Sequence, residues 1–148
     1  MTDTTPTESN LSGLDRKDFQ KNINSRKTDL YILKNAQGME VAVTNYGCAI
    51  LSIMVPDKNG KFANVILGHD SIEHVINSPE PFLSTTIGRY GNRIANGKFT
   101  LYGEEHQLTV NNGPNSLHGG PTGFHARVWD AVQPNESTVI FQLYVCRR

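Results

Sequence analysis

The chain has 148 residues, of which 37% are hydrophobic and 19% are charged, a composition typical of one globular domain and unlike that of a disordered or fibrous protein. Fourteen basic and fourteen acidic residues give a formal net charge of zero, which argues against a nucleic-acid partner because nothing attracts a phosphate backbone. No apolar run reaches the roughly 20 residues that cross a bilayer, and the polar N-terminus is unlike a signal peptide. We therefore expect no membrane partner and a cytoplasmic protein.

The first segment is typical of a leader. Residues 1–12 are rich in Thr, Ser, Asn and Pro and show no hydrophobic periodicity. We expect residues 1–18 to form a disordered leader and residues 19–148 to belong to one β-rich domain.

Short segments with alternating or continuous apolar character follow, and they predict β-strands. In chain order they are Leu30–Leu33, Met39–Val43, Ala49–Val55, Asn64–Leu67, Thr85–Ile87, Lys98–Tyr102, His106–Val110, Val128–Val132 and Thr138–Val145. Turn sequences rich in Asn, Gly and Pro separate these strands. Hairpins at such regular spacing predict an all-β sandwich or barrel.

One segment, Asp70–Ile76, has helical character. Asp70 can cap its first turn, and Glu73 can complete a capping box in front of two apolar residues. The pattern predicts a short surface helix.

Two clusters combine polar groups with glycine where the strand pattern stops. The first, Gly88–Ile94, contains two arginines and Asn92, whose planar donors suit hydroxyl or carboxylate oxygens. The alternative is structural: one arginine pairs with a carboxylate such as Asp70 or Glu104 and holds the turn closed.

The second cluster, Asn111–Gly120, is followed by His125 and Trp129. His118 stands next to a glycine pair, so the backbone beside its imidazole is bare and a ligand can approach. The alternative is a histidine that only bonds a loop carbonyl. Trp129 suits either the core or stacking against the apolar face of a sugar ring. The two histidines have no third ligand in the pattern, so we expect no metal site.

Taken together, these motifs resemble the aldose 1-epimerases, also called galactose mutarotases. The resemblance runs from about Phe19 to Leu143, and its paired signatures G-R-x-x-N-R-I and N-x-L-H-G-G are specific. The matching segments, in the family's order, are Val43–Ala49, Val55–Asp57 with Gly60, Val65–Gly68, Gly88–Ile94, Gly97–Phe99 and Asn112–Gly120.

The resemblance implies an antiparallel β-supersandwich whose concave face holds an aldohexose such as galactose or glucose. It implies an isomerase that interconverts α and β anomers by acid and base catalysis, without a cofactor. In such enzymes the histidine matching His118 bonds the sugar and assists at the ring oxygen, while the residues matching Asn92 and Arg93 bind sugar hydroxyls.

Family members are typically more than twice this long, and their principal acid and base residues, a second histidine, an aspartate and a C-terminal glutamate, lie beyond the matched stretch. We therefore expect residues 19–148 to be the N-terminal part of a mutarotase, with little turnover and with exposed strand edges that favour self-association. Two alternatives stay open: a non-catalytic carbohydrate-binding module that uses Asn92, Arg93, His118 and Trp129, or an inert fragment.

Overall fold

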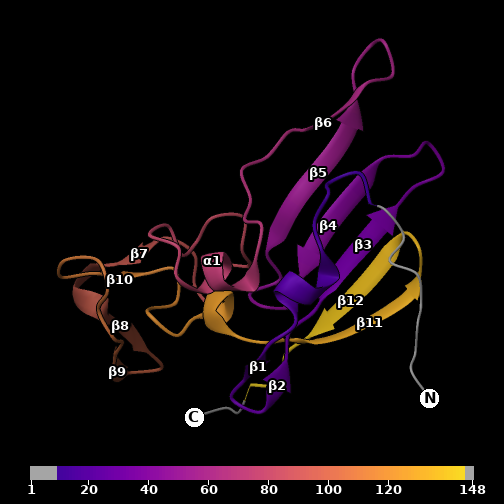
Figure 1. The fold of residues 1–148 in the computed structure, drawn as a ribbon. Helices are drawn as coiled ribbons and strands as arrows, with labels where there is room; N and C mark the ends of the chain where they lie inside the picture. The colour runs from indigo at the N-terminus through magenta and orange to yellow at the C-terminus, as the bar shows by residue number, and fades with distance from the viewer. Residues whose placement is uncertain (1–9, 146–148) are drawn as a thin grey trace.

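The computed structural model describes residues 10–145, which form short antiparallel strands joined by turns (Figure 1). The largest unit is a four-stranded antiparallel sheet with the order β3-β4-β5-β6. Its strands are β3 (Leu30–Lys34), β4 (Glu40–Thr44), β5 (Ile50–Pro56) and β6 (Phe62–Asn64). The expectation of an all-β architecture is confirmed.

A hairpin of β11 (Asp130–Asn135) and β12 (Thr138–Gln142) lies beside β3 (Figure 1). The backbone N–H of Lys34 donates to the carbonyl of Glu136 at 2.7 Å, and the Gln133 side chain donates to the carbonyl of Ile32 at 2.8 Å. These bonds hold the hairpin, a separate two-stranded sheet, beside β3, although it comes about one hundred residues later in the chain.

The remaining strands are short. β1 (Asn22–Ile23) pairs with β2 (Arg26–Lys27), β8 (Lys98–Leu101) with β9 (Glu104–Gln107), and β7 (Arg93–Ile94) with β10 (Ser116–Leu117). Three 3-10 turns accompany them: η1 (Arg16–Phe19), η2 (Ala95–Gly97) and η3 (Phe124–Ala126). Strands β7 to β10 gather on the opposite side of the molecule from the large sheet (Figure 1).

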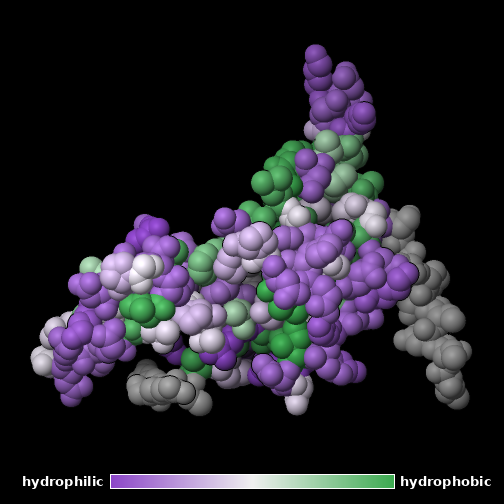
Figure 2. All heavy atoms as spheres, turned by 60° about the vertical axis from the view of Figure 1, so that its left-hand side comes forward, coloured by the Kyte–Doolittle hydropathy of each residue, from purple (hydrophilic) through white to green (hydrophobic). Residues whose placement is uncertain are grey.

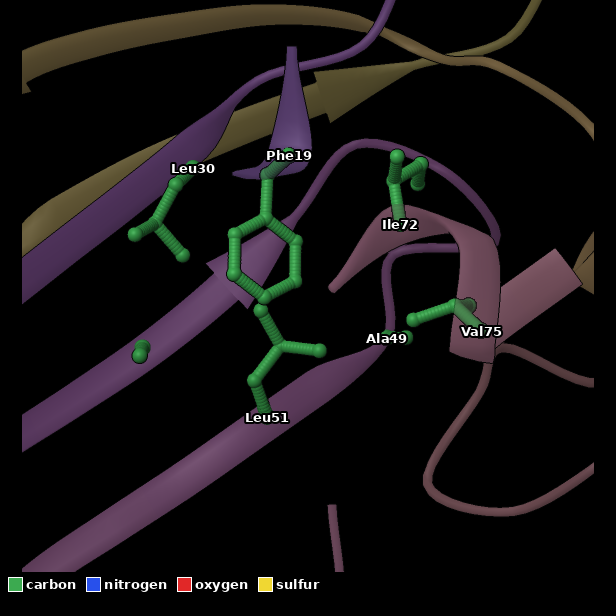
Figure 3. Close-up of a cluster of buried hydrophobic side chains, with 7 residues drawn as sticks. Phe19, Leu30, Ala49, Leu51, Ile72 and Val75 are labelled. Carbon is green, nitrogen blue, oxygen red and sulfur yellow. The ribbon is translucent and has the colours of Figure 1, made fainter. Parts of the chain in front are cut away.

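The core lies between the sheet, η1 and α1 (Ile72–Ile76). Phe19 is fully buried, and its ring lies between Leu30 and Leu51, with Ile72 and Val75 of α1 alongside (Figure 3). Ala42 and Ala49 complete the cluster. The five-residue helix α1 contributes one apolar face to this core. No helix of residues 10–145 is long and apolar enough to span a membrane.

The predicted leader is only partly tested, since residues 1–9 lie outside the described residues. Residues 10–15, which we call the strap, are ordered against the sheet, and η1 follows them directly. The Glu40 carboxylate accepts the backbone N–H groups of Leu11 at 2.8 Å and Ser12 at 3.3 Å, and Leu14 packs against the core. Residues 10–18, which the sequence analysis assigned to the leader, thus make defined contacts with the sheet and core.

Two local expectations also differ. Ser71, not Asp70, caps α1, since its hydroxyl accepts the backbone N–H of His74, while the Asp70 carboxylate contacts the His74 ring. The strand predicted at 64–67 instead occupies 62–64, because the Asn64 carboxamide accepts the backbone N–H groups of Ile53 and Ile66 and interrupts the ladder.

The segment predicted as a strand at 85–87 belongs to no strand. Its residue Thr86 donates its backbone N–H to the carbonyl of Gly47 at 2.8 Å, a single bond in a loop. Strand β9 also lies earlier than expected, at 104–107, because Gly97 accepts the Leu108 N–H at 2.7 Å and redirects the chain there.

Candidate functional site

The pairing of β7 with β10 brings the two glycine-bounded clusters together. Leu117 lies opposite Arg93 in this ladder, and the backbone N–H of His118 donates to the carbonyl of Asn92 at 3.0 Å. Residues 92–93 and 118, more than twenty positions apart in sequence, therefore occupy one place on the surface. Asn92 and Arg93 are exposed and His118 is half-buried.

A main-chain hydrogen bond fixes the tautomer of His118. The backbone N–H of Asn92 donates to Nδ1 of His118 at 2.9 Å. Because an amide N–H can only donate, Nδ1 must accept, and the neutral ring carries its proton on Nε2. Nε2 has no hydrogen-bond partner among residues 10–145 and is not among their buried unpartnered atoms. The ring thus presents an N–H donor to an incoming group.

The Arg93 guanidinium is held by carboxamides. Its Nε–H donates to Oδ1 of Asn112 at 2.8 Å, and Nη1 donates to Oδ1 of Asn92 at 3.3 Å. Within the described part of the chain neither arginine of the first cluster forms an ion pair. The structural alternative, in which one of them pairs with Asp70 or Glu104, is therefore wrong.

Glycines allow the two loops to approach this closely. Gly119 has φ +88°, and a Cβ built there would lie 2.0 Å from the Gly88 carbonyl oxygen. A Cβ at Gly88 would in turn lie 2.3 Å from the ring of Phe124. No side chain fits at either position, which explains why the sequence places glycine beside each polar cluster.

The Asn111 carboxamide hydrogen-bonds the backbone of β10 as a neighbouring strand would. Its Oδ1 accepts the Leu117 N–H at 2.7 Å, and its Nδ2 donates to the Leu117 carbonyl at 3.0 Å. Both backbone polar groups of Leu117, the residue before His118, are thereby satisfied, which holds the chain in place where it enters His118.

Phe82 contacts two imidazoles. Its ring centroid lies 4.9 Å from that of His118 and 4.5 Å from that of His125. His125 is only 5% exposed, and its Nδ1 has no hydrogen-bond partner in the described part of the chain. Burial, and then the charge of His118, lower the pKa of His125 below its usual value. His125 therefore stays neutral at neutral pH.

Trp129 serves the packing of this region. Its indole N–H donates to the carbonyl of Phe124 at 3.2 Å, and the two rings meet edge to face at 5.5 Å. Its backbone N–H donates to the Asn45 carbonyl at 2.8 Å. The structure thus holds Trp129 against Phe124, whereas Asn92 contacts both Arg93 and His118.

The sequence patterns did not single out Phe82 or Asn112. Phe82 belongs to a segment without periodicity, and no spacing rule connects it to His118. Asn112 stood within the second cluster, but only the fold shows that its carboxamide reaches Arg93. Among residues 10–145, no group of three His, Cys, Asp or Glu side chains comes together in a way that could hold a metal ion.

Solved structures resemble this arrangement of strands and loops. A GalM/aldose epimerase homologue from C. elegans matches with a TM-score of 0.73 and 33% identity, covering 77% of this chain and 35% of that one. The galactose 1-epimerase of Lactobacillus acidophilus NCFM matches with a TM-score of 0.64 and 32% identity, covering 76% and 32%. The fold is therefore that of the aldose epimerase structures.

Sequence comparison agrees. The model of the aldose 1-epimerase family matches residues 29–146. The galactose mutarotase of Bos taurus is 43% identical over 91 residues, 62% of this chain and 26% of the relative. The aldose 1-epimerase of Escherichia coli (strain K12) is 40% identical over 114 residues, 77% and 33% respectively. The chain belongs to the aldose 1-epimerase family, and it spans about a quarter to a third of these relatives' lengths.

Proposed function

We propose that the chain supplies sugar-binding loops for aldose 1-epimerase chemistry, the interconversion of the α and β anomers of an aldohexose. In this proposal His118 donates its Nε2–H to the ring oxygen, while Asn92 and Arg93 hold hydroxyl groups. The observation that carries the proposal is the bond from the Asn92 N–H to Nδ1, which leaves the His118 proton on the outward nitrogen.

Ring opening requires two proton movements. The C1 hydroxyl loses a proton, the bond from C1 to the ring oxygen breaks, and the ring oxygen takes up a proton as the free aldehyde forms. Rotation about the bond from C1 to C2 and closure by the reverse steps give the other anomer. A donor at the ring oxygen stabilises the negative charge that develops there, and His118 suits this role. We assign no general base to residues 10–145.

The donor set suits a neutral polyol. A guanidinium and a carboxamide are planar and offer fixed N–H groups, and no carboxylate competes for the Arg93 donors within the described residues. Relatives are described as galactose mutarotases, so we take galactose as the first substrate to test, with glucose beside it.

Binding without turnover is the second candidate. One observation favours it: among residues 10–145, no carboxylate contacts Asn92, Arg93 or His118, so a strong base is lacking next to them. A carbohydrate-binding module would use the same three side chains without the reaction.

Polarimetry of freshly dissolved α-D-galactose and α-D-glucose with the purified chain tests the proposal. The comparison includes buffer, His118→Ala and His74→Ala, which removes an exposed histidine of α1 outside the site. A rate above buffer that His118→Ala abolishes and His74→Ala keeps supports anomerisation by this chain. A rate equal to buffer, together with saturable galactose binding lost in His118→Ala, supports the binding module. Absence of both rejects the proposed function.

A further inference from the structure

We propose that Asn112 is a positioning residue that sets the orientation of the Arg93 guanidinium and leaves part of it available to a ligand. Its value for sugar binding rests on the proposed function above. The contact between the two side chains is independent of that function and can be tested without any sugar.

The contact uses the one hydrogen that Nε of Arg93 carries. Nε donates to Oδ1 of Asn112 at 2.8 Å, and Nη1 donates to Oδ1 of Asn92 at 3.3 Å on the other side. Two contacts to different atoms of a planar group fix both its direction and its plane. The N–H groups of Nη2 have no partner among the described residues, so they remain for a ligand.

Asn112 can orient Arg93 because its own backbone is held. Its N–H donates to the Asn115 carbonyl at 3.1 Å, and the Asn115 N–H donates to the Asn112 carbonyl at 3.0 Å. The neighbouring Asn111 side chain hydrogen-bonds the backbone N–H and carbonyl of Leu117, which lies opposite Arg93 in the β7–β10 ladder. The acceptor and the guanidinium are thus attached to the same rigid unit.

A carboxamide at this position differs from a carboxylate in one decisive way. The carboxamide offers one oxygen and no charge, so it accepts the Nε–H and leaves Nη2 alone. A carboxylate presents two oxygens that match the fork of Nε and Nη2, and it would occupy both. Asn112 therefore orders Arg93 while preserving its donors and its positive charge for hydroxyl oxygens.

Nitrogen-15 NMR of the Arg93 Nε–H group tests the contact directly. The signal is identified by its loss in Arg93→Lys, and its hydrogen exchange is measured in four proteins: the native chain, Asn112→Ala, Asn112→Asp and Asn96→Asp. The last adds the same charge at a nearby exposed residue whose carboxamide makes no hydrogen bond with the described residues. We expect a protected signal in all but Asn112→Ala. A protected signal in Asn112→Ala overturns the inference.

Titration with D-galactose then separates orientation from charge. Affinity should fall about fivefold or more in both Asn112 variants. In Asn112→Ala the Arg93 guanidinium loses its fixed orientation. In Asn112→Asp it keeps this orientation, but the new carboxylate occupies Nη2. Asn96→Asp should stay within about twofold of the native chain. Native affinity in Asn112→Asp contradicts the role assigned to the carboxamide. If the native chain binds no galactose while the NMR pattern holds, the proposed function fails and the assignment of Asn112 stands.

Discussion

At position 119 the left-handed backbone and the adjacent Gly88 carbonyl together exclude any side chain. Gly119→Ala should therefore push apart the segments that carry the site residues, with a loss of more than about 2 kcal/mol in stability. Gly113→Ala is the matched control, because its φ of +57° carries the same kind of strain but nothing lies within 4 Å of the added Cβ. The control should cost about 1 kcal/mol. Urea unfolding measures both, and equal losses would refute the steric explanation.

The buried His125 should make stability depend on pH. Its folded pKa lies below the ordinary value of 6.5 because of burial and the nearby His118, so the unfolded chain binds more protons between the two values. Stability is then full above about pH 6.5 and declines as the pH falls below it. In the native chain, the urea concentration at the unfolding midpoint should be lower at about pH 5.5 than at about pH 7.5.

The variant His125→Gln isolates this effect. It removes the titrating group, so its midpoint should change less over the same pH interval, while the contribution of carboxylates is common to both proteins. An equal change in both would show that other groups cause the pH dependence. An NMR titration of the His125 ring gives the direction of its pKa shift directly.

Sequence motifs indicated Asn92, Arg93 and His118 because glycine-bounded polar clusters are visible in the chain. Their partners were not visible. The tautomer of His118 depends on a main-chain N–H twenty-six positions away, and the orientation of Arg93 depends on Asn112, nineteen positions away. Such contacts arise from strand pairing, which residue type and periodicity do not determine.

At the scale of elements, the strap is held to the sheet by one buried carboxylate. Glu40 is 1% exposed, and its Oε1 accepts two strap N–H groups while Nζ of Lys34 lies 3.8 Å from Oε2. Glu40→Ala should lower stability by about 2–3 kcal/mol, because it leaves a void and removes the acceptor. It should also free the strap backbone for cleavage by chymotrypsin after Leu11 and Leu14.

Glu40→Gln keeps an oxygen acceptor of the same size and serves as the control. Its strap should stay largely protected from chymotrypsin, with a smaller loss of stability. Urea unfolding and limited proteolysis followed by mass spectrometry measure the two effects. Unchanged protection in Glu40→Ala would show that the strap is held by Leu14 packing instead.

Strands with a clear apolar pattern were predictable, and strands of two residues were not. Strands β3, β4 and β5 have five to seven residues with clear apolar patterns, and the sequence predicts each within about two residues. Strands β7 and β10 have two residues each, too few for a period. The strap shows no periodicity in sequence, and its order depends on contacts with the distant Glu40 and on Leu14 against the core.

For the whole molecule, exposed apolar side chains are the main feature that favours association between copies. Figure 2 shows hydrophobic atoms on the surface below the polar tip that the β5–β6 turn forms. On the β11–β12 hairpin, Val132 and Ile140 lie opposite each other, and their side chains are 62% and 55% exposed. Such a pair on a sheet with open edges favours association between copies.

Replacing this pair with Val132→Lys and Ile140→Glu should reduce self-association, because the opposite charges suit facing positions of a hairpin and resist burial. Sedimentation velocity over a concentration series measures the effect. The control is Tyr102→Asn, which removes a side chain that is 97% exposed at a different turn and keeps a residue that tolerates its positive φ. Equal behaviour of the native chain and the double variant would exclude the pair as a contact.

The main-chain bond to His118 also determines how the molecule can be redesigned. Because the donor is the peptide N–H at position 92, exchanging the side chain there changes the contacts offered to a ligand without changing the nitrogen that carries the imidazole proton. The φ of +65° at this position favours Asn, Asp and Gly there. Asn92→Asp and Asn92→Gly should therefore change the side-chain groups beside His118 and leave its proton on Nε2.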